Sequence, residues 1–264
     1  MNKTEICTIL SNTQIAQGIF KMGIKSRNIC KEAIPGQFLH VQIPHDSSLI
    51  LRRPISINDI DMEEERVDIV YQLVGKGTNI LSTLQAGDCI NVLGPLGNGF
   101  IQPKTYNNIY IIGGGCGVAP LKFFVNKHKD KHLSCFLGYR NRESSYQIED
   151  FQMMSSDVRI CTDDGSLGYK GFVNDILSEA LNYTDADLIV ACGPIPMLVG
   201  IQALSNRYDI PCQISLEERM GCGVGGCLVC VCKIKASTPE GWTYKKVCTD
   251  GPVFWAKEVV LADE

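Results

Sequence analysis

The sequence predicts a multidomain chain of β and α/β structure, with an antiparallel β-barrel, a doubly wound parallel sheet and a small cysteine-rich module. Short alternating apolar runs broken by glycine and proline fill the first part of the chain. Buried apolar runs then alternate with helical stretches, and closely spaced cysteines dominate the end. The predicted domain limits are residues 1–102, 103–215 and 216–264.

Composition excludes several classes of function. The 264 residues carry a formal net charge of −4 without a basic run, which argues against nucleic acid as a partner. The N-terminus lacks the pattern of a signal peptide, and no apolar run approaches the roughly 20 residues of a membrane helix. We therefore expect a cytoplasmic protein that does not span a membrane. In that compartment, 13 cysteines favour metal binding or reduced buried thiols over disulfides.

The barrel is predicted from three alternating runs, at residues 37–43, 67–74 and 88–93. Turn-forming glycine and proline residues separate these runs, and one short helix is expected at 79–84. Several short strands with a single helix are typical of a small antiparallel barrel.

Alternating β and α segments predict the second domain. Short apolar runs suited to buried parallel strands occur at residues 108–112, 133–137, 157–161 and 187–191. Helical stretches are expected up to residue 129, at 171–181 and at 196–208. This alternation favours a doubly wound parallel sheet.

Four cysteines near the C-terminus carry the strongest chemical signal. Cys222, Cys227 and Cys230 have the spacing C-x4-C-x2-C, and Cys248 follows at a distance. This pattern is that of thiolates around a plant-ferredoxin-type 2Fe-2S cluster. Zinc is the main alternative, although only Cys227 and Cys230 form a Cys-x-x-Cys pair. Unliganded thiols remain a third possibility.

A glycine-rich loop opens the α/β domain. Gly113, Gly114, Gly115 and Gly117 follow a predicted strand and precede a helix that has Pro120 in its first turn. Free N–H groups and the positive end of the helix dipole would accept a pyrophosphate there. The loop departs from the strict G-x-G-x-x-G pattern, and a tight turn without a ligand is the alternative.

A second loop follows a later strand of the same domain. Cys192 and Gly193 stand at its carboxyl end, where doubly wound sheets bind ligands, and Cys192 could face a nicotinamide ring. A buried thiol explains Cys192 equally well. The segment 163–168 is either close to the ligand or a plain β-turn.

Two segments of the barrel are candidate anion sites. Arg52 and Arg53 offer guanidinium groups beside a strand, and Ser56 offers a hydroxyl. In the loop 75–78, Thr78 can cap the following helix. A surface strand is the alternative for the arginines.

Taken in order, these motifs resemble the ferredoxin–NADP reductase superfamily. The segments 53–56, 75–78, 113–120 and 192–194 carry the resemblance. With the C-terminal cysteines, the whole chain is similar to the electron-transfer subunits of type B, NAD-dependent dihydroorotate dehydrogenases. The resemblance implies an FAD-binding barrel, a nicotinamide-binding α/β domain and a 2Fe-2S module.

The resemblance also implies roles for individual residues. FAD would be held by Arg53, Pro54, Ile55, Ser56, Val70, Tyr71, Gln72, Gly77 and Thr78, with Arg53 on the pyrophosphate and Ser56 near the flavin ring. NAD(H) would lie along Gly113, Gly114, Gly115, Gly117, Cys192 and Gly193. Cys222, Cys227, Cys230 and Cys248 would ligate the cluster, and Cys232 would not. The interval from Cys230 to Cys248 is longer than is usual in the family, which predicts an extended hairpin around 239–242.

The function implied is an electron relay in pyrimidine synthesis. Electrons would pass between NADH, FAD and the cluster to an FMN-containing dihydroorotate dehydrogenase catalytic subunit, within a two-plus-two heterotetramer. No residue of this chain would act as an acid or base on dihydroorotate. Two alternatives remain: a flavin and iron–sulfur subunit of a ferredoxin–NADP reductase or sulfide dehydrogenase complex, and a zinc-bound interaction module. The choice between NADH and NADPH stays open, because Arg140 and Arg142 could admit a 2′-phosphate or could simply be solvated.

Overall fold

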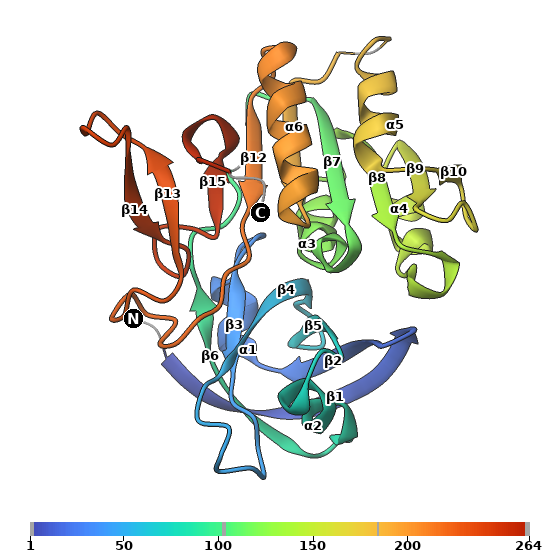
Figure 1. Cartoon of the computed structure of the whole chain (residues 1–264). Coiled ribbons are helices and arrows are strands. Elements are labelled where there is room, and N and C mark those ends of the chain that lie inside the picture. The colour runs from blue at the N-terminus through green and yellow to red at the C-terminus, as the bar shows by residue number, and fades with distance from the viewer. Residues whose placement is uncertain (1–2, 102–103, 184, 262–264) are drawn as a thin grey trace.

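A computed structural model describes residues 3–101, 104–183 and 185–261 of the chain. Figure 1 shows a barrel at the bottom, a layered α/β domain above it and a β-hairpin to one side. No helix among the described residues is long and apolar enough to cross a membrane.

The N-terminal part forms a closed antiparallel barrel with strand order β1-β2-β5-β4-β3-β6. Its elements are β1 (Lys3–Ala16), β2 (Ile19–Lys25), α1 (Arg27–Glu32), β3 (Phe38–Val41), β4 (Arg53–Asp61), β5 (Arg66–Gln72), α2 (Lys76–Thr83) and β6 (Cys89–Leu96). The predicted runs correspond to β3, β5 and β6, and the predicted helix to α2. Strands β1 and β2 were not predicted, because their mixture of polar and apolar residues gives a weak pattern.

The middle part forms a sheet of order β10-β9-β8-β7-β11-β12-β15. Its strands are β7 (Asn108–Gly114), β8 (His132–Tyr139), β9 (Asp157–Thr162), β10 (Tyr169–Lys170), β11 (Leu188–Cys192), β12 (Cys212–Ser215) and β15 (Val253–Trp255). The helical segments are η1 (Gly115–Val118), α3 (Ala119–Lys127), η2 (Arg142–Ser144), α4 (Ile148–Met154), α5 (Val173–Ala180), α6 (Ile195–Arg207) and η3 (Ala256–Glu258).

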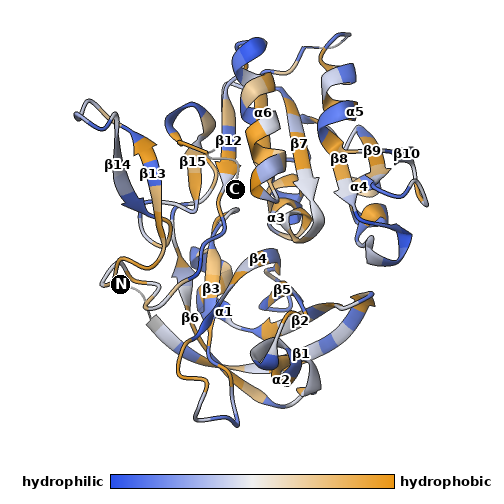
Figure 2. Ribbon diagram, in the orientation of Figure 1, coloured by the Kyte–Doolittle hydropathy of each residue, from blue (hydrophilic) through white to orange (hydrophobic). Residues whose placement is uncertain are grey.

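The direction of winding reverses between β7 and β11, as in a doubly wound sheet. Alternate residues of β7 point to opposite faces: Ile109 and Ile111 pack with α3 and α4, whereas Tyr110 and Ile112 pack with α5 and α6. Figure 2 shows the resulting apolar centre of the domain. The predicted fold class is confirmed.

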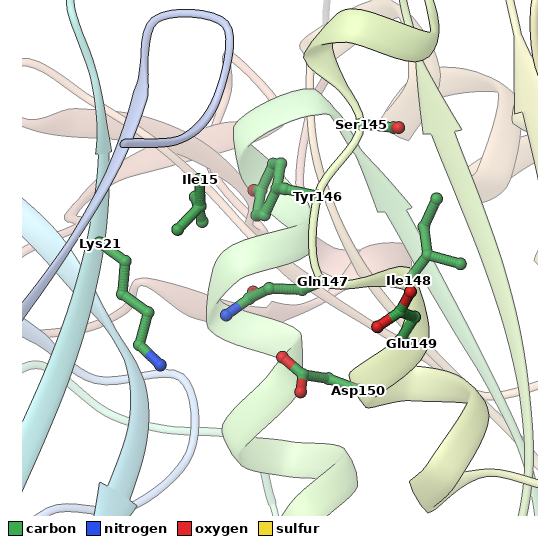
Figure 3. Close-up of a pocket in the computed structure, with 8 residues that line it drawn as sticks. All are labelled: Ile15, Lys21, Ser145, Tyr146, Gln147, Ile148, Glu149 and Asp150. Atoms are coloured by element: carbon green, nitrogen blue, oxygen red, sulfur yellow. The ribbon is translucent and has the colours of Figure 1, made fainter. Parts of the chain in front are cut away.

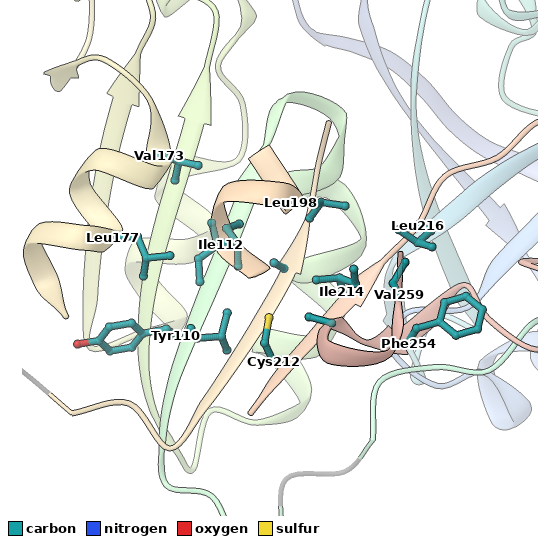
Figure 4. Packing of buried hydrophobic residues seen from close by; sticks show 14 of the residues in the cluster. Tyr110, Ile112, Val173, Leu177, Leu198, Cys212, Ile214, Leu216, Phe254 and Val259 are labelled. Atoms are coloured by element: carbon teal, nitrogen blue, oxygen red, sulfur yellow. The ribbon is translucent and has the colours of Figure 1, made fainter. Parts of the chain in front are cut away.

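The C-terminal segment forms the expected hairpin from β13 (Val231–Lys235) and β14 (Trp242–Lys246), and then contributes β15 to the α/β sheet. β15 pairs antiparallel with β12, and Phe254 on β15 is only 6% exposed. Figure 4 shows Phe254 and Val259 packed beside Ile214 and Leu216. The cysteine-rich segment is therefore anchored to the α/β core as well as to its own loops. The predicted domain limits stay predictions.

Polar contacts join the barrel to the α/β domain in the second half of β4, where its pairing with β5 is irregular. Asn58 is completely buried, and its Nδ2 donates to the Ala119 carbonyl at 2.8 Å and to Gln147 Oε1 at 3.0 Å. Asn126 Nδ2 on α3 donates to Asp59 Oδ1 at 2.8 Å. These contacts hold β4 against both ends of α3.

Replacing Phe254 tests the anchoring of the C-terminal segment. Phe254→Ala removes a buried ring from the core, so we expect a loss of about 3–5 kcal/mol in the free energy of unfolding. Denaturant unfolding of the cofactor-loaded protein measures it. Met153→Ala, at a side chain 77% exposed, is the control and should stay within about 0.5 kcal/mol of the parent. Equal stabilities of the two variants would contradict the anchoring.

Candidate functional site

Arg53, at the start of β4, lies against the first turn of α2. A Cβ atom placed on Gly77 would be only 3.1 Å from Arg53 Nε, so glycine allows this close approach. The guanidinium donates to the Leu51 carbonyl at 2.6 Å and forms no ion pair with any described residue. It remains available for an anion.

The neighbouring Arg52 is engaged elsewhere. Its Nη2 donates to Asn91 Oδ1 at 2.7 Å, and its Nη1 donates to the His40 and Asn91 carbonyls, both at 3.2 Å. Arg52 therefore braces strands of the barrel. Of the two arginines considered in the sequence, only Arg53 is brought to α2.

The loop before α2 is held by Thr78, the third residue of the helix. Thr78 Oγ1 accepts hydrogen bonds from the backbone N–H groups of Val74 at 3.0 Å and Gly75 at 3.3 Å. The first turn of α2, with its N–H groups, and the Arg53 guanidinium therefore lie close together. Such a donor set suits a pyrophosphate.

The predicted flavin residues of β5 make different contacts. Tyr71 is buried and donates to Asn12 Oδ1 at 2.9 Å, and burial raises the pKa of its hydroxyl to about 12. Val70 packs toward the α/β domain, while Gln72 is exposed. On β4, Ile55 is buried in the barrel core, and Pro54 and Ser56 are partly exposed.

The two predicted nicotinamide loops lie side by side at the switch point of the sheet. Gly113 of β7 pairs with Cys192 of β11. A Cβ on Gly117 would lie 2.2 Å from the Cys192 carbonyl oxygen, and one on Gly193 would lie 2.4 Å from Met197 Cε. Close packing of the loops therefore requires these glycines.

Two further glycines of the first loop differ in their surroundings. A Cβ on Gly114 would meet Met197 Sδ at 2.5 Å, so Gly114 also serves loop packing. Gly115 has a left-handed backbone, with φ of +53°, and open space around it. It is thus the glycine of this loop that faces room for a ligand.

Cysteines flank this site on both sides. Cys192 is 1% exposed, and burial holds the pKa of its thiol well above the ordinary value, so the thiol is neutral. Cys116 is half-buried and donates to Gln72 Oε1 at 3.2 Å, which connects the glycine loop to the last residue of β5. Cys116 was not among the predicted site residues, although its place inside the glycine loop is a usable signal. Tyr146, whose hydroxyl donates to the Gly115 carbonyl at 3.1 Å, carried no such signal.

A separate cavity of about 410 Å³ lies where the barrel meets α4. Figure 3 shows Lys21 on one side and Gln147 and Asp150 on the other. None of the site residues predicted from the sequence lines it.

The predicted cluster ligands occupy one loop and the base of the hairpin. Cys222 Sγ accepts from the N–H groups of Val224 at 3.5 Å and Cys227 at 3.4 Å, which lower the pKa of its thiol to about 7. Cys230 and Cys248 are buried and are joined through the Val247 N–H, which donates to the Cys230 carbonyl at 2.7 Å. Burial and the neighbouring Cys230 raise the pKa of Cys248 to about 11.

The four thiols are not gathered into one closed group. Within the described ranges, no three His, Cys, Asp or Glu residues are grouped so as to hold a metal ion. N–H donors aimed at Cys222 Sγ nevertheless suit a thiolate that carries the charge of an iron–sulfur cluster. Cys232 is half-buried on β13, and burial raises its pKa to about 11.

His40 on β3 connects the barrel to the cysteine loop and was missed in the sequence. It is 1% exposed, and a Cβ on Gly223 would lie 2.5 Å from its Nδ1. Neither ring nitrogen has a hydrogen-bond partner among the described residues, and burial lowers the pKa of the ring. An isolated histidine within a short strand offers no sequence signal for this contact.

A closed barrel joined to a doubly wound sheet, with a cysteine loop packed against β3, is the architecture of flavin- and nicotinamide-dependent electron-transfer proteins. Residues 217–260 match the family described as the iron–sulfur cluster binding domain of dihydroorotate dehydrogenase B. The chain is 40% identical over 253 residues to the dihydroorotate dehydrogenase B (NAD(+)) electron transfer subunit of Caldanaerobacter subterraneus subsp. tengcongensis, covering 96% of this chain and 97% of the relative. The subunit of that name from Enterococcus faecalis is 39% identical over 264 residues, covering 98% and 99%. The chain belongs to this family of electron transfer subunits.

Solved structures of related electron-transfer proteins share this fold. The structure of an NADH-dependent reduced ferredoxin–NADP oxidoreductase, studied for flavin-based electron bifurcation, matches with a TM-score of 0.86 and 30% identity, over 99% of this chain and 92% of that one. A ferredoxin NADP+ reductase from Neisseria gonorrhoeae with bound FAD and NADP shares the fold, with a TM-score of 0.65, 15% identity and coverage of 77% and 91%.

These matches confirm the resemblance, the electron-transfer function and the cofactor set of FAD, 2Fe-2S cluster and NAD(H). The match to an iron–sulfur binding domain favours the cluster over zinc. The roles of individual residues stay predictions.

Gly117→Ala tests the packing of the two nicotinamide loops. The new methyl group would collide with the Cys192 carbonyl and push the loops apart, so we expect kcat/KM for NADH to fall about tenfold or more. Stopped-flow reduction of the FAD-loaded protein by NADH measures this. Gly87→Ala is the control, because it strains a turn with φ of +96° but meets no atom within 4 Å. Unchanged NADH kinetics in FAD-loaded Gly117→Ala would contradict the assignment.

Proposed function

We propose that this chain carries electrons between NADH and an FMN-containing dihydroorotate dehydrogenase catalytic subunit, in pyrimidine synthesis in the cytoplasm. The assembly we propose is a two-plus-two heterotetramer. The observation that carries the proposal is the arrangement around β3. One neighbour of β3 is β4 with Arg53, and His40 of β3 lies under the cysteine loop.

The flavin site would use the donors gathered at the start of α2. Arg53 and the first turn of α2, held by Thr78, would bind the pyrophosphate, and Ser56 would lie near the ring. Bound FAD supplies the exchange between the two-electron chemistry of nicotinamide and the one-electron chemistry of a cluster.

The nicotinamide would approach from the other side, along the loops at Gly115 and Cys192. The contact between Cys116 and Gln72 supports this arrangement, because it brings the glycine loop against the last residue of β5. The neutral thiol of Cys192 would help to keep water from the reacting ring.

Cys222, Cys227, Cys230 and Cys248 would be the cluster ligands. The loop that carries the first three exposes Val224, Leu228 and Val229, with Leu228 72% exposed. Neighbouring exposed apolar side chains are typical of a protein interface, so we place the catalytic subunit over this loop.

A ferredoxin–NADP reductase type of complex is the second candidate. It is favoured by the likeness, at 30% identity over 99% of this chain, to the bifurcating NADH-dependent oxidoreductase. The partner protein decides between the two functions.

Orotate formation separates these functions. We expect the isolated, cofactor-loaded chain to reduce artificial acceptors with NADH and to form no orotate from dihydroorotate, because it supplies no acid or base for that substrate. Co-expression with the catalytic subunit should give NAD-dependent orotate formation, followed by absorbance. Orotate formation by the lone chain would contradict the proposal. A tight complex that turns over only ferredoxin would favour the alternative.

Arg53→Gln tests the flavin site. Losing charge-assisted hydrogen bonds to a phosphate costs about 1.5–3 kcal/mol, so we expect the Kd for FAD to rise roughly ten- to hundredfold. Fluorescence titration of the deflavinated protein measures it. Arg52→Gln is the matched control, because Arg52 is engaged with His40 and Asn91; it should lower stability and leave the Kd nearly unchanged. Equal effects of the two variants would refute the role of Arg53.

A further inference from the structure

Lys246, the last residue of β14, organises the turn that presents Cys248. Its backbone N–H donates to Asp250 Oδ2 at 2.7 Å. Its carbonyl oxygen accepts from the N–H groups of Thr249 at 3.2 Å, Asp250 at 2.8 Å and Gly251 at 3.3 Å. Cys248 is therefore held in a tight, fully bonded turn that begins at Lys246.

The same residue pairs with the strand that follows Cys230. Lys246 lies opposite Val231 in the hairpin, and the next residue, Val247, donates to the Cys230 carbonyl at 2.7 Å. Backbone contacts at the base of the hairpin thus bring Cys230 and Cys248 together without the side chain of Lys246.

The side chain of Lys246 reaches the other pair of cysteines. Lys246 Nζ donates to the Gly225 carbonyl at 2.8 Å, in the middle of the interval between Cys222 and Cys227. Gly225 has φ of +78°, and a Cβ there would lie 3.0 Å from Thr249 Cγ2, so the loop and the turn are in contact. A glycine is required here because its backbone is left-handed and because a Cβ atom would come too close to Thr249.

Lys246 Nζ forms no ion pair with a described residue, since no carboxylate among them lies within ion-pair distance, and the side chain is half-buried. The carboxylate of Asp250, which binds the backbone N–H of the same residue, is exposed to solvent. A partly desolvated cation at this place interacts more strongly with nearby charge than an exposed one does.

We propose that Lys246 is a positioning residue of the cluster site, which fastens the Cys222–Cys227 loop to the turn of Cys248 and raises the reduction potential of the cluster by its positive charge. The physical reason is that reduction adds negative charge to the cluster, and a nearby cation stabilises the reduced form. The inference rests on the proposed ligand set.

The test uses the anaerobically purified, cofactor-loaded chain. Lys246→Gln removes the charge and keeps a donor, Lys246→Met removes both, and Lys246→Arg keeps both. Lys245→Met is the matched control, since this neighbouring lysine is exposed on the opposite face of β14. The two readouts are the reduction potential, followed by electron paramagnetic resonance, and the rate of iron loss to a chelator.

We expect Lys246→Gln and Lys246→Met to shift the ratio of oxidised to reduced cluster about three- to tenfold toward the oxidised form, where tenfold equals about 59 mV for a one-electron couple. Lys246→Met should also lose iron several-fold faster, because its loop is no longer fastened. Lys246→Arg and Lys245→Met should match the parent in both readouts.

Lys246→Met with the potential and iron-loss rate of Lys245→Met would overturn the inference. Faster iron loss with an unchanged potential in Lys246→Met would overturn its electrostatic part. A Cys222→Ser variant tests the ligand set separately: a changed cluster spectrum is expected, and an unchanged one would overturn the ligand assignment together with this inference.

Discussion

The buried amide of Asn58 is the interaction on which the arrangement of the two large domains depends. Asn58 and Gln147 exchange hydrogen bonds of 3.0 and 2.9 Å, and Asn58 also donates to the Ala119 carbonyl at the start of α3. Leaving such a buried group unpaired would cost about 1–3 kcal/mol, so one relative placement of barrel and sheet is favoured over others of similar apolar contact. Because Arg53 and Asn58 both belong to β4, this docking also fixes the strand that carries Arg53 relative to α3.

The cysteine loop is integrated in a comparable way. His40 of β3 fills the space that a side chain at Gly223 would need, and Phe254 of β15 lies in the α/β core. The C-terminal segment therefore contacts the barrel and the sheet at once. This position places the predicted cluster ligands next to β3, which pairs with the strand that carries Arg53. Within that segment, the Lys246 side chain holds the loop at Gly225 against the end of β14.

Most of the architecture could be predicted from local patterns. Period-two alternation located β3, β5 and β6, apolar runs located β7, β8, β9 and β11, and the long Cys230–Cys248 interval indicated the hairpin. Local sequence patterns did not predict strands that are irregular or that mix polar and apolar residues. An example is β1, whose pairing with β2 shifts register twice. Such patterns also could not separate Arg52 from Arg53, because the two share a local sequence and differ only in their partners across the barrel.

The sequence alone determined the classes of chemistry: cysteine spacing for a cluster, glycine loops for a dinucleotide, and an arginine with a helix start for a phosphate. These signals are local, because backbone freedom, donor type and ligand spacing depend on residues close together in the chain. Only the tertiary structure decided that Cys116 contacts Gln72, that His40 underlies Gly223 and that Lys246 reaches Gly225. Each of these contacts joins elements distant in sequence, and it exists only once packing and buried hydrogen bonding have set those elements in place.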